Sequence, residues 1–169
     1  MRMFWWLYFR YWMTVTYFFP DVSPVLKLRG WLVRPAFKRC GKNFKIAHNA
    51  QITFTSQVSI GDNVFIAHGA WIHGLGQVTL QDEVSMGPYA IILSSAHKQG
   101  PGSLRFAPNE LAPVTLCKGA YVGSHSVILK GVTIGENALI TPGTVVATDI
   151  PASAMATGNP ARAIMRPIA

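Results

Sequence analysis

Apolar positions from residue 40 onward recur every six residues, which is neither the period of a helix nor that of a single strand. The clearest run opens its hexads at Leu116, Val122, Ile128, Ile134, Ile140 and Val146. The same phase appears earlier, at Ile46, Ile52, Ile60, Ile66, Ile72, Leu80, Met86 and Ile92. A small or β-branched residue usually follows four positions later, with turn-forming residues between. Because such repeats bury a core only by stacking, the pattern predicts a parallel β-helix with three hexads per coil.

The spacing of the first hexad of each coil predicts how many coils there are and where they are interrupted. These hexads open at Cys40, Ile60, Leu80, Leu116 and Ile134, at spacings of 20, 20, 36 and 18 residues. Three hexads make a coil of 18 residues, so we expect about five coils, with two-residue bulges at residues 54–57 and 75–77. The spacing of 36 predicts an excursion loop over residues 94–113. Long loops in regular domains are usually functional or mobile.

A different pattern precedes the repeat. Residues 3–19 are apolar and aromatic but are interrupted by Arg10, which shares one helical face with Thr14 and Tyr17. A membrane span needs about 20 mainly apolar residues, so a span is marginal here. A cleaved signal peptide is disfavoured because bulky rings run up to Pro20. The pattern favours a helix lying in a membrane interface. The alternative is a terminal helix that packs on the body of the protein or on a partner subunit.

Composition and charge narrow the classes of function. The chain of 169 residues is 50% hydrophobic and 13% charged, which excludes a disordered chain and argues against a coiled coil. Two cysteines cannot form the disulfide framework of a small secreted scaffold. Residues 1–45 hold nine basic residues and one acidic residue, so they carry the whole net charge of +8. Residues 46–169 are neutral, which indicates a basic attachment segment rather than a nucleic-acid-binding domain.

These patterns divide the chain into three parts. Residues 1–39 form an apolar, basic segment of membrane-interface or packing helices. Residues 40–157 form the β-helix with its excursion loop, and residues 158–169 form a tail that leaves the repeat. Anionic lipid attracts lysine and arginine, so we expect a cytoplasmic protein that is peripheral at the cytoplasmic face of the membrane.

The repeat resembles the hexapeptide-repeat acetyltransferases, which are left-handed β-helices. The resemblance is carried by residues 60–64 (IGDNV), 131–137 (GVTIGEN), 142–146 (PGTVV) and 158–161 (GNPA), and by a histidine-bearing loop before residues 113–116 (PVTL). It is greatest to bacterial surface-polysaccharide O-acetyltransferases of the colanic acid and galactoside type. It implies a homotrimer with active sites between subunits, acetyl-CoA as co-substrate and no metal. The acceptor would be a sugar hydroxyl of a polysaccharide or lipopolysaccharide precursor, and the apolar N-terminus favours a lipid-linked saccharide.

Acetyl transfer needs a base for the hydroxyl, donors for the oxyanion and a groove for the coenzyme. The resemblance assigns the base to His97. The sequence leaves open what orients its ring, with a backbone carbonyl and Glu110 as the two candidates. Coenzyme and oxyanion contacts are assigned to Tyr121, Gly123, Ser124, Pro142, Gly143, Thr148, Arg162 and Arg166. Tyr121 stands where many relatives carry tryptophan. The arginines suit the coenzyme phosphates because they form charge-assisted pairs.

The acceptor site departs from the galactoside-type pattern. Ala67 and Leu75 stand where those relatives carry an asparagine and an aspartate that contact the sugar. A simple galactoside acceptor is therefore not supported. His68 follows Ala67 directly, and we interpret it as a residue that reaches the acceptor from a neighbouring subunit.

Other functions remain open from the sequence. His68 and His73 have a spacing that resembles a ligand pair of γ-class carbonic anhydrases, and His48 occupies the same hexad position one coil before His68. No histidine stands near residue 32, where the third ligand would be. The acceptor could instead be an antibiotic, serine or an amino sugar, and the chain could be a non-catalytic β-helix. A covalent intermediate on Cys117 is disfavoured, because no histidine and acid pattern lies near it.

Overall fold

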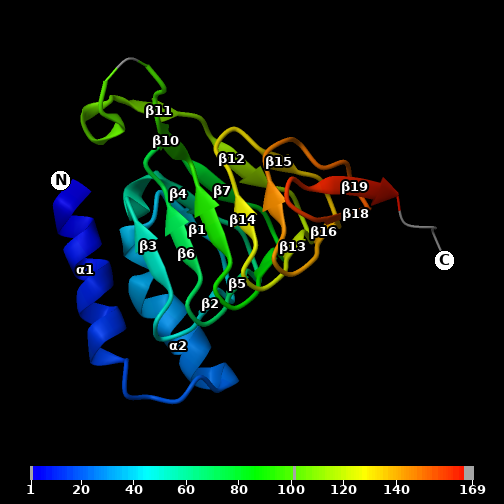
Figure 1. Cartoon of the computed structure of the whole chain (residues 1–169). Helices are drawn as coiled ribbons and strands as arrows, with labels where there is room; N and C mark the ends of the chain where they lie inside the picture. Colours follow the sequence, from blue (N-terminus) through cyan, green and yellow to red (C-terminus); the bar gives the residue numbers. More distant parts are fainter. Residues whose placement is uncertain (1, 101, 166–169) are drawn as a thin grey trace.

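The computed structural model describes residues 2–100 and 102–165, and it confirms a left-handed β-helix of about five coils (Figure 1). Three parallel sheets form the sides of the prism. The first sheet contains β1 (Arg39–Cys40), β4 (Val58–Ile60), β7 (Val78–Leu80), β12 (Val114–Leu116) and β15 (Thr133–Ile134). The second contains β2 (Lys45–Ile46), β5 (Phe65–Ile66), β8 (Ser85–Met86), β13 (Tyr121–Val122) and β16 (Leu139–Ile140). The third contains β3 (Gln51–Thr53), β6 (Trp71–His73), β9 (Ile91–Leu93), β14 (Val127–Ile128) and β17 (Val145–Val146).

The core is a set of aliphatic ladders that run along the axis of the prism. In the first sheet Cys40 pairs with Ile60, Ile60 with Leu80, Leu80 with Leu116, and Leu116 with Ile134. These are the five positions that the hexad phase predicts. The four aliphatic side chains are at most 1% exposed. Burying one Leu or Ile side chain contributes about 1.5–3 kcal/mol, so the stacked ladder is the main stabilising feature of the solenoid.

The interruptions of the repeat lie where the spacing places them. The first bulge holds Phe54 in the left-handed region, with φ of 55°, followed by the short helix η2 (Thr55–Gln57). The second bulge holds Gln77 at φ of 76°. The excursion is an antiparallel pair of strands, β10 (Ser95–His97) and β11 (Asn109–Leu111), joined through η3 (Leu104–Phe106). The Ala112 N–H donates to the Ser94 carbonyl over 3.1 Å and closes the loop at its base.

Both ends of the solenoid are covered. At the carboxyl end, β18 (Ala154–Thr157) and β19 (Arg162–Met165) form an antiparallel pair that extends the second sheet. At the other end lie α1 (Arg2–Val15), α2 (Ser23–Val33) and the short helix η1 (Arg34–Ala36) (Figure 1). Phe9, Met13 and Val33 from these helices belong to the same buried cluster as the first coil. Among the helices of the described residues, none is long and apolar enough to cross a membrane.

Arg29 ties the helical cap to the first coil. Its side chain is fully buried, and its guanidinium donates to Asp21 Oδ1 over 2.8 Å and to the Ile46 carbonyl over 3.0 Å. It also donates to the hydroxyl and the carbonyl of Thr16, over 3.0 and 3.1 Å, and to the Phe19 carbonyl over 3.2 Å. A buried charge persists only when it is paired and hydrogen-bonded, and here one side chain meets both conditions. Arg29 therefore organises the turn between the two helices around β2.

Replacing Arg29 with methionine is expected to lower the free energy of unfolding by about 3 kcal/mol or more, because Asp21 and three carbonyls lose their donor. Urea denaturation followed by circular dichroism measures this loss. Lys27→Met is the matched control on the same helix, and its exposed side chain predicts a change within about 0.5 kcal/mol. Equal midpoints for Arg29→Met and the wild-type protein would contradict the role given to Arg29.

The stability of the helical cap depends on pH through Asp21. Burial raises the pKa of Asp21, but hydrogen bonds from His48 and Arg29 outweigh burial and leave this pKa below its ordinary value of 3.8. A depressed carboxyl pKa stabilises the folded state above about pH 4, and this stability is lost as the pH falls through the folded-state pKa. Asp21→Asn should therefore lose less stability than the wild type between about pH 4 and pH 2. Urea denaturation over this range checks it, with exposed Glu136→Gln as the control.

Candidate active site

His97 stands at the end of β10, exposed on the excursion loop. Its Nδ1 donates a long hydrogen bond of 3.4 Å to the Ala107 carbonyl. A carbonyl can only accept, so Nδ1 is the donor in this contact, and in the neutral ring the lone pair lies on Nε2. Glu110 is paired elsewhere, with Lys130 Nζ 3.2 Å from its Oε1. Of the two orienting groups suggested by the sequence, the backbone carbonyl is the one in contact.

The base of the loop is anchored by residues that the sequence analysis did not identify. Ser94 is buried, and its hydroxyl donates to the His73 carbonyl over 2.6 Å and accepts from the Gly76 N–H over 2.9 Å. Ser95 Oγ lies 3.1 Å from His73 Nδ1. Burial lowers the pKa of His73, which favours its neutral form. Ser94 stands two positions after the hexad opener Ile92, where the preceding coil carries Gly74 and the following coil carries Lys130, so the hexad pattern gives no signal for this anchor.

Beside His97, the loop borders an open pocket of about 490 Å³. Residues 98–100, 102–104 and 106–108 line it. Ala107, which holds the ring of His97, is one of these lining residues. The loop therefore presents the histidine next to a space that is large enough for a small part of a substrate.

Four of the predicted coenzyme residues lie at the corner between the second and third sheets. The Gly143 N–H donates to the Ser124 carbonyl over 2.9 Å, which stacks the corners of two consecutive coils. The Gly123 N–H donates to the Ile140 carbonyl over 2.8 Å, so it is already used within the solenoid. A side chain at Gly123 would meet the Pro142 nitrogen at 2.6 Å, which explains the glycine. Among the described contacts the Ser124 N–H has no acceptor, and it is the backbone donor left for an oxyanion.

The remaining coenzyme candidates are spread over neighbouring surfaces. Tyr121 is 41% exposed on β13, in the same sheet as Arg162 on β19. Thr148 is exposed and follows β17, at the corner between the third and first sheets. Arg166 lies outside the described residues. The structure therefore brings Tyr121 and the Ser124 corner to adjoining parts of the surface and places Thr148 on another edge.

A single chain does not bring His97 to the Ser124 corner. The excursion loop leaves the prism after β9, between the third and first sheets, whereas Ser124 lies between β13 and β14. Figure 1 shows the loop on the opposite side of the third sheet from the turn that joins β13 to β14. The acceptor candidates divide in the same way. Ala67 is buried at the corner between the second and third sheets, which is also the corner of Ser124. Leu75 is half-buried at the corner between the third and first sheets, where the excursion loop leaves the prism, and its carbonyl accepts from Gln57 Nε2 over 3.0 Å.

Aromatic and imidazole rings form a ladder along the Ser124 corner. The ring centroids of His48 and His68 are 5.2 Å apart, those of His68 and Tyr89 are 5.4 Å apart, and Tyr89 stacks on His125 at 5.1 Å. Asn49 Oδ1 accepts from the Gly69 N–H over 2.9 Å, which orients its amide nitrogen 3.1 Å from His68 Nε2. His68 Nε2 is therefore an acceptor. The ladder ends beside Ser124.

The histidine arrangement differs from the carbonic anhydrase interpretation. His73 lies at the base of the loop, whereas His68 belongs to the ring ladder at another corner. Among the described residues, the group with ligand atoms close enough for a metal ion is Asp21, His48 and His68, within 4.8 Å of one another. In it, Asp21 Oδ2 lies 2.9 Å from His48 Nδ1. The pair expected from the sequence, His68 and His73, does not form such a group within one chain.

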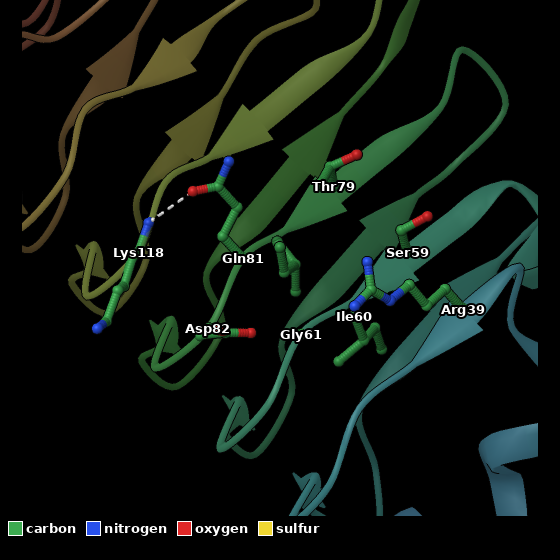
Figure 2. Close-up of a pocket in the computed structure, with 9 residues that line it drawn as sticks. Arg39, Ser59, Ile60, Gly61, Thr79, Gln81, Asp82 and Lys118 are labelled. Atoms are coloured by element: carbon green, nitrogen blue, oxygen red, sulfur yellow. Dashed lines mark hydrogen bonds between the residues drawn. The ribbon is translucent and has the colours of Figure 1, made fainter.

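A separate groove of about 310 Å³ lies on the first sheet and contains none of these candidates (Figure 2). Arg39, Asp82 and Lys118 are among its lining residues. The Lys118 N–H donates to Gln81 Oε1 over 3.0 Å, and the Asp62 N–H donates to Asp82 Oδ1 over 2.8 Å. These side chains satisfy the backbone of neighbouring corners, so the polar character of the groove follows from the turns of the solenoid.

Neither cysteine lies in a setting that activates a nucleophile. Cys40 is buried in the core, and burial raises the pKa of its thiol to about 11, although Arg34 acts in the opposite direction. Cys117 is half-buried, and its N–H donates to the Ile134 carbonyl over 2.9 Å. A catalytic thiol needs a lowered pKa or an adjacent base, so the geometry favours direct transfer over an acetyl-enzyme.

Comparison with known proteins gives consistent matches. The family described as "Bacterial transferase hexapeptide (six repeats)" matches residues 113–148. "Putative acetyltransferase YJL218W" of Saccharomyces cerevisiae is 30% identical over 135 residues, which are 80% of this chain and 69% of that protein. Galactoside O-acetyltransferase of Escherichia coli is 29% identical over 140 residues, or 79% of this chain and 59% of that enzyme.

Two further matches bear on the chemistry of relatives. A solved structure of galactoside acetyltransferase in complex with coenzyme A superposes with a TM-score of 0.82 at 26% identity, covering 96% of this chain and 80% of that one. A shorter match, 47% identical over 55 residues, is to dTDP-3-amino-3,6-dideoxy-alpha-D-galactopyranose 3-N-acetyltransferase of Aneurinibacillus thermoaerophilus. It covers 32% of this chain and 29% of that enzyme. The relatives therefore include both O- and N-acetyltransferases.

Proposed function

This chain belongs to the hexapeptide-repeat acetyltransferase family, and from that premise we propose that it transfers an acetyl group from acetyl-CoA to a saccharide hydroxyl. The acceptor in this proposal is a precursor of a surface polysaccharide or lipopolysaccharide. The observation that carries it is the hydrogen bond of His97 to the Ala107 carbonyl, because it holds Nε2 as a free base on the excursion loop. The galactoside enzyme that matches along most of this chain supports transfer to oxygen.

The proposed reaction is a direct transfer in a ternary complex. Nε2 of His97 takes the proton of the acceptor hydroxyl as its oxygen attacks the thioester carbonyl carbon. The carbonyl π electrons move to oxygen, and the Ser124 N–H donates to this oxyanion. When the tetrahedral intermediate collapses, the C–S bond breaks and the imidazolium returns its proton to the leaving sulfur. The products are the acetyl ester and coenzyme A.

This mechanism requires more than one copy of the chain. His97 and Ser124 lie at different corners of the same prism, so a site containing both is built from the loop of one subunit and the corner of another. A homotrimer provides such a site three times through one repeated, head-to-tail interface. In this arrangement Tyr121, Pro142 and Gly143 lie along the coenzyme on the Ser124 corner, and Arg162 is placed to pair with a phosphate.

A second candidate function keeps the donor and changes the acceptor to the amine of a nucleotide-linked amino sugar. The N-acetyltransferase match over 55 residues favours it. Both reactions use the same general base, so the acceptor contacts decide between them. An acceptor screen that offers matched hydroxyl and amino sugars with acetyl-CoA separates the two, with acetylated product detected by mass spectrometry.

His97→Asn is expected to lower kcat by about 10²- to 10⁴-fold, which is the usual contribution of a general base. Asparagine retains polarity and similar size but cannot accept the proton. Coenzyme release with a thiol reagent, run on the best acceptor from the screen, measures the change. Arg105→Ala, in the same exposed loop but not among the residues that line the cavity beside His97, is the control for loop folding and should keep near-normal turnover. Near-normal turnover of His97→Asn would remove His97 from the mechanism.

Acetyl-CoA is expected to bind saturably to the purified protein without stoichiometric metal. Calorimetry gives the affinity, and elemental analysis of the same sample gives the metal content. Arg162→Ala should weaken binding by about ten-fold, because it loses one charge-assisted contact with phosphate. Arg105→Ala, on the excursion loop, is the charge-matched control. An absence of coenzyme binding together with about one metal ion per chain would instead support a metal enzyme.

A further inference from the structure

The outward face of α1 is mostly apolar, with Arg10 and Thr14 exposed along one edge of it. Phe4, Leu7 and Tyr11 are 62%, 52% and 60% exposed, although the opposite face of the helix is packed into the core. These residues are spaced by three and four positions, so they line one side of the helix. Phe18, just beyond the helix, is 89% exposed. Contiguous exposed apolar surface of this kind marks a site of interaction with a protein or a membrane.

The second helix adds basic groups and another aromatic ring. A groove of about 200 Å³ lies between α2 and the first coil, with Lys27, Arg34, Lys42 and Trp31 among its lining residues. Trp31 is 67% exposed. Among the described ion pairs, none involves these three cations. The groove is therefore a positively charged pocket next to an exposed aromatic side chain.

The charge of the whole chain is concentrated at this end of the solenoid, in the helical cap and the first coil together. Residues 1–45 carry the net charge of +8, while the rest of the chain is neutral. Arg29 is internal and is paired with Asp21, the single acidic residue of this segment, so their pair leaves the outward charge unchanged. Both helices lie at one end of the solenoid, and β18 and β19 lie at the other (Figure 1).

We propose that the helical cap docks on an anionic phospholipid bilayer. In this arrangement Phe4, Leu7, Tyr11 and Phe18 enter the boundary between headgroups and acyl chains. A bilayer offers both an apolar layer and a layer of negative charge, which the cap matches with its exposed rings and its lysines and arginines. A second copy of the same cap fits less well, because two surfaces of the same strong positive charge repel each other.

Vesicle sedimentation of the purified full chain tests this proposal without any substrate. We expect the protein to sediment with vesicles of phosphatidylcholine and phosphatidylglycerol and to stay in solution with phosphatidylcholine alone. Raising the salt concentration to about 1 M shortens the screening length to about 3 Å and should release most of the bound protein. Equal binding to both kinds of vesicle, or to neither, would overturn the proposal.

Two sets of variants separate the charged and apolar contributions. Lys27→Gln, Arg34→Gln and Lys42→Gln, made one at a time, should each weaken vesicle binding by about five-fold. Lys118→Gln is the matched control, since this exposed lysine lies in the groove of the first sheet, and it should bind as the wild type does. If all four variants bind alike, the basic groove is not part of the docking surface.

The triple variant Leu7→Ser, Tyr11→Ser and Phe18→Ser should abolish vesicle binding while circular dichroism and the unfolding midpoint stay unchanged, because these side chains are exposed. If it does not fold, the single charge variants still decide the proposal. Light scattering tests the alternative that a second copy of the chain, and not a bilayer, occupies this face. A triple variant that lowers the oligomer mass, with no vesicle binding by the wild type, would assign the face to a second copy of the chain.

Discussion

Every coil of the solenoid depends on its neighbours, since a triangular coil of three short strands buries nothing by itself. The aliphatic ladder buries the apolar faces between neighbouring coils, but the outer faces of the first and last coils have no neighbouring coil to cover them. At the carboxyl end the chain turns back and pairs β19 with β18. At the amino end two helices cover the first coil, and the buried guanidinium of Arg29 connects their turn to β2. The cap is thus part of the core, and its loss would expose the first coil to water.

The same constraint decides where chemistry can be placed. Strand positions are used by the ladder, so the sequence is free to vary at the corners and in the excursion loop. His97 stands on the loop. Ser124 stands at a corner, where its own N–H has no acceptor among the described contacts, whereas the N–H of the preceding Gly123 is bonded within the solenoid. One chain holds these two groups on different edges of the third sheet. Assembly is therefore a catalytic requirement in the proposed mechanism and not merely a source of stability.

The hexad period predicts the register of the first sheet because a stacked repeat has one solution for its inward positions. Cys40, Ile60 and Leu80 pair as their spacing requires, and the excess residues emerge as bulges and a loop. Contacts outside the period could not be predicted in this way. The acceptor for His97 is a carbonyl within an irregular loop, which the hexad period does not describe. The buried Arg29 stands in a segment whose basic composition indicates surface charge.

The sequence poses membrane contact and packing on the body as alternatives for the N-terminal helices, but the two concern different faces of the same elements. Packing is observed on the inward face, and membrane contact is our proposal for the outward face. Phe9 and Met13 pack inward while Phe4, Leu7 and Tyr11 face outward, so neither function excludes the other. Packing also prepares the outward face, because a helix already held by the core loses little conformational freedom on docking. Arg29 supports this arrangement twice, since it fixes the turn between the helices and neutralises the segment's one carboxylate. The surface charge of the cap is then entirely positive.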